Sequence, residues 1–202
     1  MSTDRRSSLS IETVSGQGIE QYLSDLAFLR IEIFREYPYL YDGSVGYEEK
    51  YLSTYISSKG SIAVLVFDDD QLVGASTGLP LDDETDEFKK PFLAHGIDPK
   101  TVFYCGESIL KKKYRGKGIY SVFMNEREVH AKRLEKFDLI CFCAVSREKH
   151  HPLKPKDYIP LDEIWNKYGY KQVPFLKTNY FWKDIDKDEE TPKEMIFWIK
   201  NL

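Results

Sequence analysis

The chain has 202 residues, of which 42% are hydrophobic and 31% are charged, and its formal net charge is −4. This composition is typical of a globular protein with enough apolar residues for a core, and it excludes a disordered chain. An acidic net charge argues against general nucleic-acid binding, which depends on neutralising phosphates. No apolar run approaches the length of about 18 residues that a membrane-spanning helix needs, so we expect no membrane partner.

The N-terminal residues 1–9 lack the apolar segment of a signal peptide. We expect a short disordered tail there, followed by a single domain over residues 10–202. The cysteines Cys105, Cys141 and Cys143 lie in apolar runs, are odd in number and form no CxxC pair. This pattern favours buried free thiols in a reducing compartment, and we therefore expect a cytoplasmic protein.

The first half of the chain alternates between strand and helix patterns. The periodicity of its apolar residues and its turn residues predict a strand over Ser10–Gly16 and helices over Gly18–Tyr37 and about Tyr47–Ser57. A β-hairpin over Ile62–Gly74, an acidic loop over Asp82–Phe88 and a strand over Thr101–Leu110 should follow. Pro38 should end the first helix because proline cannot continue the hydrogen-bonding pattern.

The last of these strands leads directly into the basic segment KKKYRGKGIY, residues 111–120. A helix over Ile119 to about Leu134 should follow, and then a strand over Asp138–Val145 whose near-continuous apolar run indicates burial on both faces. Glycines in a strand-to-helix turn let the backbone approach a ligand, and the start of the helix offers unpaired N–H groups. A phosphate or pyrophosphate suits this place, with Arg115 and Lys117 adding charged contacts.

Other interpretations of the basic segment fit less well. It matches neither the Walker A pattern nor the dinucleotide-binding glycine pattern, because Ser121 stands where the third glycine of the latter should be. A nuclear sorting signal fits by composition alone, and without its context the segment is equally well explained as an ordinary turn.

The C-terminal part begins with a proline-rich loop over Arg147–Leu161. A short helix over Asp162–Gly169 and two strands, Leu176–Ile185 and Met195–Lys200, complete the chain. The loop contains His150 and His151, but adjacent histidines point in different directions, so we expect no metal site.

The motif and the order of elements together resemble the GNAT superfamily of acyl-CoA-dependent N-acyltransferases. The loop of that family reads R/Q-x-x-G-x-G/A between a strand and a helix, and residues 115–120 match it except that Tyr120 stands where a small residue is usual. The resemblance covers residues from about 10 to 202. It implies one α/β (α+β) domain, with a mixed, mostly antiparallel sheet of about seven strands, splayed in the middle and flanked by about four helices.

The resemblance also implies that acetyl-CoA is the co-substrate, lying between the strand that ends at Leu110 and the strand 138–145. Its pyrophosphate would sit on the backbone N–H groups of the loop, and its pantetheine arm would bond to the backbone of the strand. The implied cofactor-binding residues are Ser108, Ile109, Leu110, Arg115, Gly116, Lys117, Gly118, Ile119 and Tyr120.

The implied reaction is acetyl transfer to a primary amine by direct attack in a ternary complex. The amine must lose a proton, and Glu107 is the candidate base, although a carboxylate held in a structural salt bridge explains it equally well. The tyrosine that commonly serves as the acid in this family is replaced by Trp165, so either the thiolate leaves unassisted or Tyr158 protonates it.

The acceptor should be a small-molecule or peptide amine, held by the segment after the first helix and by the proline-rich loop. The candidate residues are Tyr37, Tyr39, Tyr41, Arg147 and His151. Tyrosine rings can hold a cation, and the acidic loop could attract one, but packing and solvation explain both equally well. The alternative function is an acyl-CoA-binding regulatory protein with little or no catalysis. Either a monomer or a homodimer fits the sequence.

Overall fold

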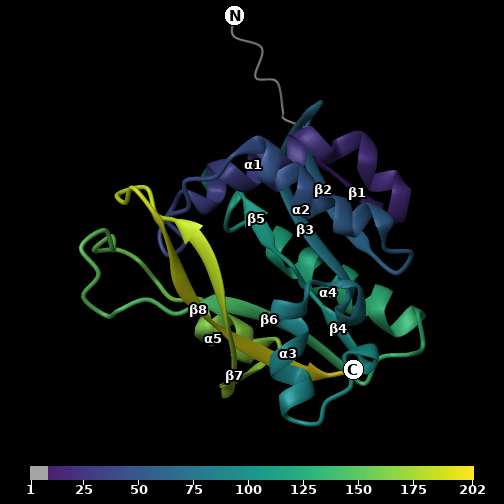
Figure 1. Cartoon of the computed structure of the whole chain (residues 1–202). Coiled ribbons are helices and arrows are strands. Elements are labelled where there is room, and N and C mark those ends of the chain that lie inside the picture. Colours follow the sequence, from purple (N-terminus) through teal and green to yellow (C-terminus); the bar gives the residue numbers. More distant parts are fainter. Residues whose placement is uncertain (1–8) are drawn as a thin grey trace, which may run out of the picture.

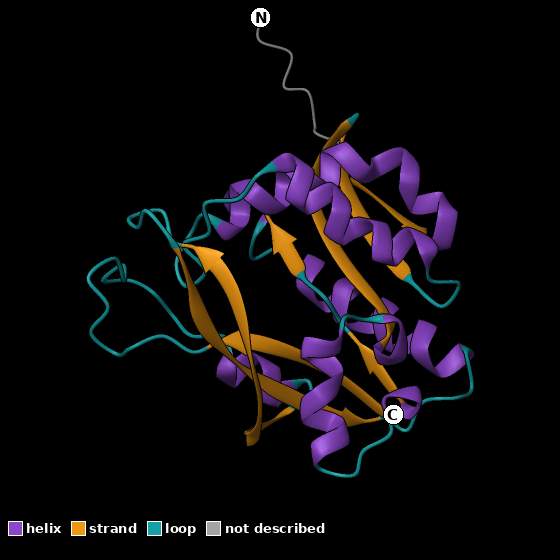
Figure 2. Cartoon of the chain, viewed as in Figure 1, coloured by secondary structure: helices purple, strands orange, loops and turns teal. Residues whose placement is uncertain are grey.

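The computed structural model describes residues 9–202, and its centre is an eight-stranded sheet (Figures 1 and 2). The strands run in the order β1-β2-β3-β4-β6-β8-β7, with β5 beside β3; the pair β4–β6 is parallel and the other neighbours are antiparallel. Their bounds are Leu9–Val14, Ile62–Asp68, Gln71–Pro80, Val102–Tyr104, Ser108–Leu110, Leu139–Val145, Lys171–Lys183 and Glu190–Asn201 for β1 to β8. The mixed, mostly antiparallel sheet that the resemblance implies is therefore confirmed, with eight strands where about seven were expected.

Five α-helices within residues 9–202 cover the two faces of this sheet. They are α1 Leu23–Phe34, α2 Val45–Ser57, α3 Asp86–Ala94, α4 Ile119–Arg133 and α5 Asp162–Lys167. Buried residues of α1, α2 and α3 belong to one core cluster, and those of α4 to the other, against which α5 also packs. None of the helices in the described range combines the length and the apolar character that crossing a bilayer requires.

The two-sided core explains the apolar character of the hairpin strands. Along β2, Ala63 and Leu65 belong to the cluster under α1 and α2, whereas Val64 and Val66 belong to the cluster under α4. Because successive side chains of a strand point to opposite faces, both sets are buried and the run is continuously hydrophobic.

The predicted strand Thr101–Leu110 is in fact two short strands that part the sheet. β4 pairs with β6 up to Tyr104 and Cys141, and the N–H of Cys105 makes one further bond to the carbonyl of Cys141. The chain then turns toward β3, where the N–H of Thr77 bonds the carbonyl of Glu107 and β5 begins. β5 and β6 therefore diverge beyond Cys105, which is the splay expected from the resemblance.

Three other expectations need correction. The predicted tail covers residues 1–8, which lie outside the described residues, and Leu9, which already belongs to β1. The helix predicted over Gly18–Tyr37 is a 3₁₀-helix over Gly16–Tyr22 followed by α1, which ends at Phe34. The predicted acidic loop contains the start of α3, because Phe88 is buried against the sheet and fixes the helix there.

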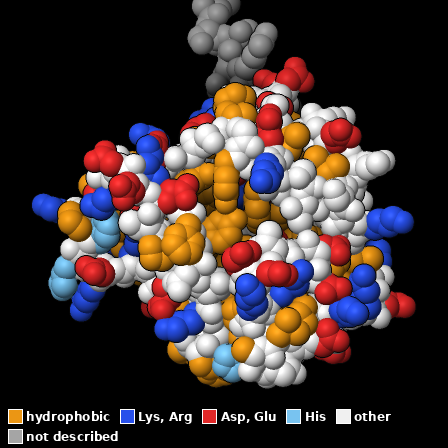
Figure 3. All heavy atoms as spheres, in the orientation of Figure 1, with side chains coloured by type: hydrophobic (Ala, Val, Ile, Leu, Met, Phe, Trp, Pro, Cys, Tyr) orange, Lys and Arg blue, Asp and Glu red, His pale blue; other side chains and the backbone are white. Residues whose placement is uncertain are grey.

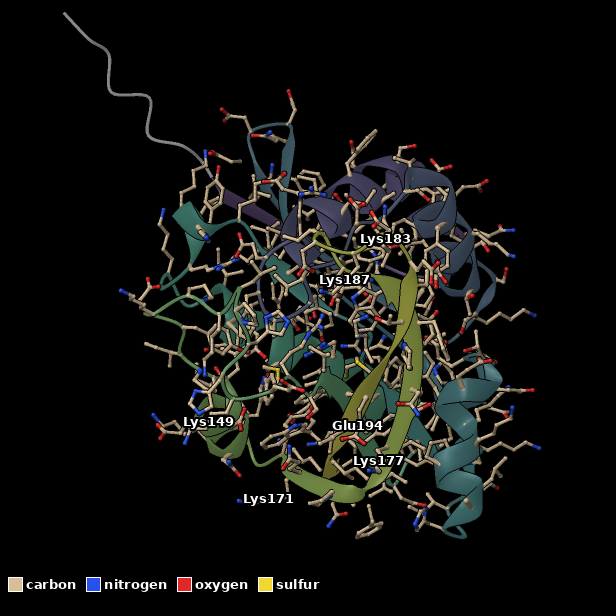
Figure 4. All side chains as sticks on the ribbon, turned by 60° about the vertical axis from the view of Figure 1, so that its left-hand side comes forward. Lys149, Lys171, Lys177, Lys183, Lys187 and Glu194 are labelled. Atoms are coloured by element: carbon tan, nitrogen blue, oxygen red, sulfur yellow. The ribbon has the colours of Figure 1, made fainter. Side chains whose placement is uncertain are left out.

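The C-terminal hairpin is longer than predicted and reaches across to the segment between α1 and α2. In Figure 4, Lys183 and Lys187 lie at the end of the hairpin near these helices, and Lys171 lies at the opposite end. Nζ of Lys183 is 2.7 Å from a carboxylate oxygen of Asp42, and Tyr41 forms an isolated β-bridge with Asp184. These contacts hold β7 against the segment that was predicted to bind the acceptor.

Candidate active site

The basic segment forms a turn that leads into the longest helix of the described residues. Gly116 and Gly118 have φ of 77° and 81°, a left-handed conformation that a residue with a Cβ rarely adopts, and Gly118 is the N-cap of α4. The N–H groups of Ile119 and Tyr120 have no partner within the helix, whereas that of Ser121 donates to the carbonyl of Gly118 at 3.0 Å. Nε of Arg115 donates to the carbonyl of Leu110 at 2.9 Å, and Nη2 lies 3.2 Å from Glu36. Lys117 is also exposed and, unlike Arg115, makes no ion pair within residues 9–202.

The parting of β5 from β6 opens a cavity of about 330 Å³, which we call the splay cavity. One wall is the backbone of Cys105–Ser108, and the opposite wall is Phe142–Lys149. Tyr120 and Arg127 of α4 line it from below, and Trp165 of α5 lines it from the side. The predicted cofactor residue Ser108 thus faces the cavity, whereas the side chain of Ile109 is buried in the core.

Glu107, the predicted base, lies in a buried ion-pair network. The guanidinium of Arg30 pairs with Oε2 of Glu107 and with Oε2 of Glu48, and all three side chains are nearly inaccessible to solvent. Oε1 of Glu107 is buried without a hydrogen-bond partner among the described residues. A buried carboxylate oxygen without a donor costs free energy, and it is an acceptor available to a ligand.

Arg127 is a second buried arginine, and it differs from Arg30 in having no ion pair within residues 9–202. Its Nη1 donates to the carbonyl of Glu107 at 3.2 Å, Nη2 lies 3.0 Å from the sulfur of Met124, and Nε is unpaired. Arginine stays protonated in proteins, so the bottom of the splay cavity carries a fixed positive charge. Sequence analysis missed this residue, because Arg127 is an ordinary helix residue until the fold buries it.

Tyr120 and Trp165, the two departures from the family pattern, contact each other across the splay cavity. The indole Nε1 of Trp165 donates to the phenol oxygen of Tyr120 at 2.8 Å. Burial raises the pKa of Tyr120, and Arg127 and the Trp165 N–H offset part of that rise. The phenol therefore keeps its proton near neutral pH and can donate it toward the cavity.

The predicted residues of the proline-rich loop lie at the rim of the splay cavity. The ring of Tyr158 meets the ring of Tyr37 edge-on with centroids 4.7 Å apart, and His151 lies on the other side of Tyr37 at 5.9 Å. Burial, together with Tyr37 and Asp162, raises the pKa of Tyr158. Tyr37 and Tyr158 line the cavity, whereas Nδ1 of His151 accepts a bond from the N–H of Leu153.

Arg147 fixes the segment that carries Tyr39. Its guanidinium bonds both carboxylate oxygens of Asp184, at 2.7 and 2.8 Å, and the carbonyls of Pro38 and Tyr39. The guanidinium of Arg147 thus makes four hydrogen bonds to other residues of the protein. The structure therefore gives Arg147 a positioning role at the cavity wall.

A second, smaller pocket opens on the other side of the splay, and we call it the aromatic pocket. It has a volume of about 90 Å³ and is lined by rings from α2, α3 and β7, among them Tyr51, Phe88 and Trp182. Figure 3 shows a hollow with hydrophobic side chains at its base near the centre of the face in view. Gly106 and Cys143 line both the aromatic pocket and the splay cavity, so the two spaces meet at the point where the sheet parts.

Glycine is required at this junction. A Cβ on Gly106 would lie 2.0 Å from the phenol oxygen of Tyr55, closer than two non-bonded atoms can approach. The neighbouring thiols are unreactive, because burial raises the pKa of Cys105 to about 11 and that of Cys143 to about 12. No group of three or more potential metal ligands occurs among residues 9–202.

Comparison with solved structures gives matches over nearly the whole chain. NAA60 of Arabidopsis thaliana in complex with acetyl-CoA superimposes with a TM-score of 0.61 at 11% identity, covering 96% of this chain and 99% of that one. A GNAT-family acetyltransferase from Streptococcus pneumoniae gives 0.58 at 12%, covering 96% and 100%. The ribosomal-protein-alanine N-acetyltransferase of Brucella melitensis gives 0.60 at 12%, covering 96% and 99%. The chain has the GNAT fold.

Comparison of the amino-acid sequence alone gives no match. No protein-family model matches it, and no curated protein matches it. The GNAT fold is therefore established by structure, and it agrees with the splayed sheet and the glycine loop before α4 that the motif predicted.

Proposed function

We propose that this protein is an N-acetyltransferase that moves an acetyl group from acetyl-CoA to a primary amine by direct attack in a ternary complex. The observation that carries the proposal is the meeting of the splay cavity and the aromatic pocket at Gly106 and Cys143. Two substrates entering from opposite sides would bring thioester and amine together there, and holding them together supplies much of the rate.

Acetyl-CoA would lie in the splay cavity. Its pyrophosphate would accept bonds from the backbone N–H groups of residues 115–120, where the dipole of α4 favours an anion. Its pantetheine arm would follow β5 along the backbone of residues 108–110. The complex of NAA60 with acetyl-CoA, which shares this fold, supports the choice of co-substrate.

Glu107 would accept the proton of the attacking amine through Oε1, which has no other donor within the described chain. The neutral amine nitrogen then bonds to the thioester carbon, the C–S bond breaks to release the CoA thiolate, and the proton that the new amide nitrogen still has to lose passes to solvent. The positive charge of Arg127 would stabilise this thiolate from the bottom of the cavity.

Of the four tyrosines that line the splay cavity, two are candidates to protonate the thiolate. Tyr158, the candidate from the sequence, lies at the rim against Tyr37. Tyr120 is the stronger candidate, because the Trp165 N–H donates to its oxygen and so polarises its own O–H toward donation.

The residues that the sequence predicts for the acceptor would line the path by which it reaches the junction. They are Tyr37, Tyr39, Tyr41, Arg147 and His151. Tyr39 lines both spaces, and Tyr41 lines the aromatic pocket. Arg147 would act through the carbonyls of Pro38 and Tyr39 that it holds.

Thermal unfolding with acetyl-CoA tests the proposed cofactor site. Ligand at about a hundred times its Kd stabilises the native state by about 2.7 kcal/mol, a rise of roughly 5–11 °C for a chain of this size. Gly118→Asp should abolish the shift. Gly96→Asp is the matched control, because Gly96 also has a positive φ, 72°, and an open environment but lies away from the loop.

Release of the CoA thiol in the presence of amines tests the transfer. A shift with turnover supports the enzyme, whereas a shift without turnover on any amine supports an acyl-CoA-binding regulatory protein. The absence of a shift at millimolar acetyl-CoA rejects both.

A further inference from the structure

The aromatic pocket has a composition suited to a cation. Its walls are the rings of Tyr47 and Tyr51 from α2, Phe88 from α3, and Tyr180 and Trp182 from β7. Aromatic faces attract an ammonium group and also pack against methylene groups. Rings on several sides of one narrow space therefore favour a ligand that is both cationic and aliphatic.

The charged side chains that line the aromatic pocket are one cation and one anion. Arg30 and Glu48 line the pocket, and the single guanidinium of Arg30 is shared between the carboxylates of Glu48 and Glu107. Glu84, whose Oε1 accepts the phenol hydrogen of Tyr51 at 3.2 Å, does not line the pocket, and burial raises its pKa, so it does not add to the charge that a ligand meets. An ammonium group entering the pocket would meet the carboxylate of Glu48 in a low-dielectric environment, where attraction is strong.

The volume of the pocket restricts the shape of this cation. A cavity of about 150 Å³ holds benzene, and the aromatic pocket has about 90 Å³. It is therefore smaller than a cavity known to hold an aromatic ring, whereas an unbranched chain of methylene groups has the cross-section of a single CH₂. Branching next to the nitrogen would widen the ligand at its leading end.

The pocket also has two distinct ends. At one side Tyr47 from α2 and Tyr180 from β7 join through their hydroxyls at 2.9 Å, and both side chains are partly exposed. At the other end Gly106 and Cys143 open into the splay cavity. A chain that enters beside the tyrosine pair would present its terminal nitrogen to the junction.

We propose that the aromatic pocket binds the unbranched aminoalkyl chain of the acceptor, with its terminal ammonium directed at Gly106 and its methylene groups between the rings. This inference rests on the proposed acetyl transfer and names the acceptor class for it. Once Glu107 has taken a proton from the ammonium, the neutral amine attacks the thioester carbon, the C–S bond breaks, the thiolate leaves, and the nitrogen releases its second surplus proton to solvent. A free diamine or polyamine and a lysine side chain share this chemistry.

An acceptor panel tests the shape requirement. Butylamine and isopropylamine have similar basicity but differ in branching next to the nitrogen, and benzylamine adds a ring. We expect kcat/KM for butylamine and cadaverine to exceed that for isopropylamine and benzylamine by about tenfold or more. Equal rates for butylamine and isopropylamine would overturn the inference and leave the acetyl transfer standing.

Two further outcomes show where the aminoalkyl chain comes from and whether a failure concerns this inference alone or the acetyl transfer as well. A preference for cadaverine over Nα-acetyl-lysine methylamide assigns the chain to a free diamine, and the reverse preference assigns it to a lysine side chain. Acetyl-CoA binding without turnover on any of these amines rejects the transfer and this inference together.

Paired substitutions test the charge requirement. Glu48→Gln should raise KM for butylamine by about tenfold, because it removes a carboxylate that lines the pocket. Glu84→Gln is the matched control, since Glu84 is equally buried beside Tyr51 but does not line the pocket, and its KM should stay within about twofold. If Glu48→Gln and Glu84→Gln changed KM equally, these carboxylates would affect KM only through the stability of the fold, and the charge requirement would be wrong. The unfolding midpoint of each variant reports whether it has folded.

Discussion

Trp165 donates its indole N–H to the phenol oxygen of Tyr120 across the splay cavity, at 2.8 Å. The two residues lie 45 positions apart in the chain, and each stands where the resemblance to GNAT proteins expects a different residue. The two departures therefore form one contact, in which a tyrosine from α4 occupies the cavity beside the tryptophan of α5.

Tyr120→Phe tests whether this phenol protonates the leaving thiolate. We expect kcat to fall by about a hundredfold, with the Kd for acetyl-CoA little changed, because general acid catalysis contributes about 10²–10⁴ to the rate. Single-turnover acetylation measures it, and Tyr158→Phe is the comparison. A larger loss of kcat in Tyr158→Phe would move the acid to the proline-rich loop.

Glu107→Gln tests the proposed base. It should lower kcat by about a hundredfold while acetyl-CoA still raises the unfolding midpoint. Glu48→Gln removes the other carboxylate partner of Arg30 and so controls for the broken ion pair. If both variants lose the same kcat, Glu107 serves the structure through Arg30 and is not the base.

Arg127→Met should have opposite effects on stability and activity. Arg127 has no ion pair within the described residues, so replacing its buried charge by an apolar side chain of similar size removes a desolvation cost without breaking a pair. We therefore expect an unchanged or higher free energy of unfolding in urea, together with a lower kcat from the loss of thiolate stabilisation. Destabilisation with unchanged kcat would instead assign the guanidinium to holding the carbonyl of Glu107.

Asp184→Asn should make stability less dependent on pH in the acidic range. Burial alone would raise the pKa of Asp184, but the ion pairs with Arg147 and Lys193 outweigh it and hold the pKa below its usual value. A lowered pKa gives stability that is present above about pH 4 and is lost as the pH falls through the folded-state pKa.

At pH 7 the substitution should cost roughly 3 kcal/mol, because it leaves Arg147 without its buried partner. The difference between wild type and variant should shrink below about pH 4. Denaturant unfolding at several pH values measures it, with the exposed Asp186→Asn as control. A difference that stays constant with pH would mean that the carboxylate charge does not stabilise the fold.

The amino-acid sequence by itself determined the local features of this protein. Strand and helix periods located the hairpin and the helix after the basic segment. The glycines of residues 115–120 identified the turn, because a left-handed backbone and an exposed helix start are properties of a few consecutive residues. The order of elements then carried the resemblance to the GNAT fold, which the structure confirms.

Only the tertiary structure decided what the site contains. Arg30 and Glu107 are 77 positions apart, and their pairing depends on α1 lying over the point where the sheet parts. The aromatic pocket draws Tyr51, Phe88 and Tyr180 from two helices and a strand that share no sequence pattern. Burial gives Arg127 its importance, and burial is a property of the packed chain, to which residues distant in sequence contribute most.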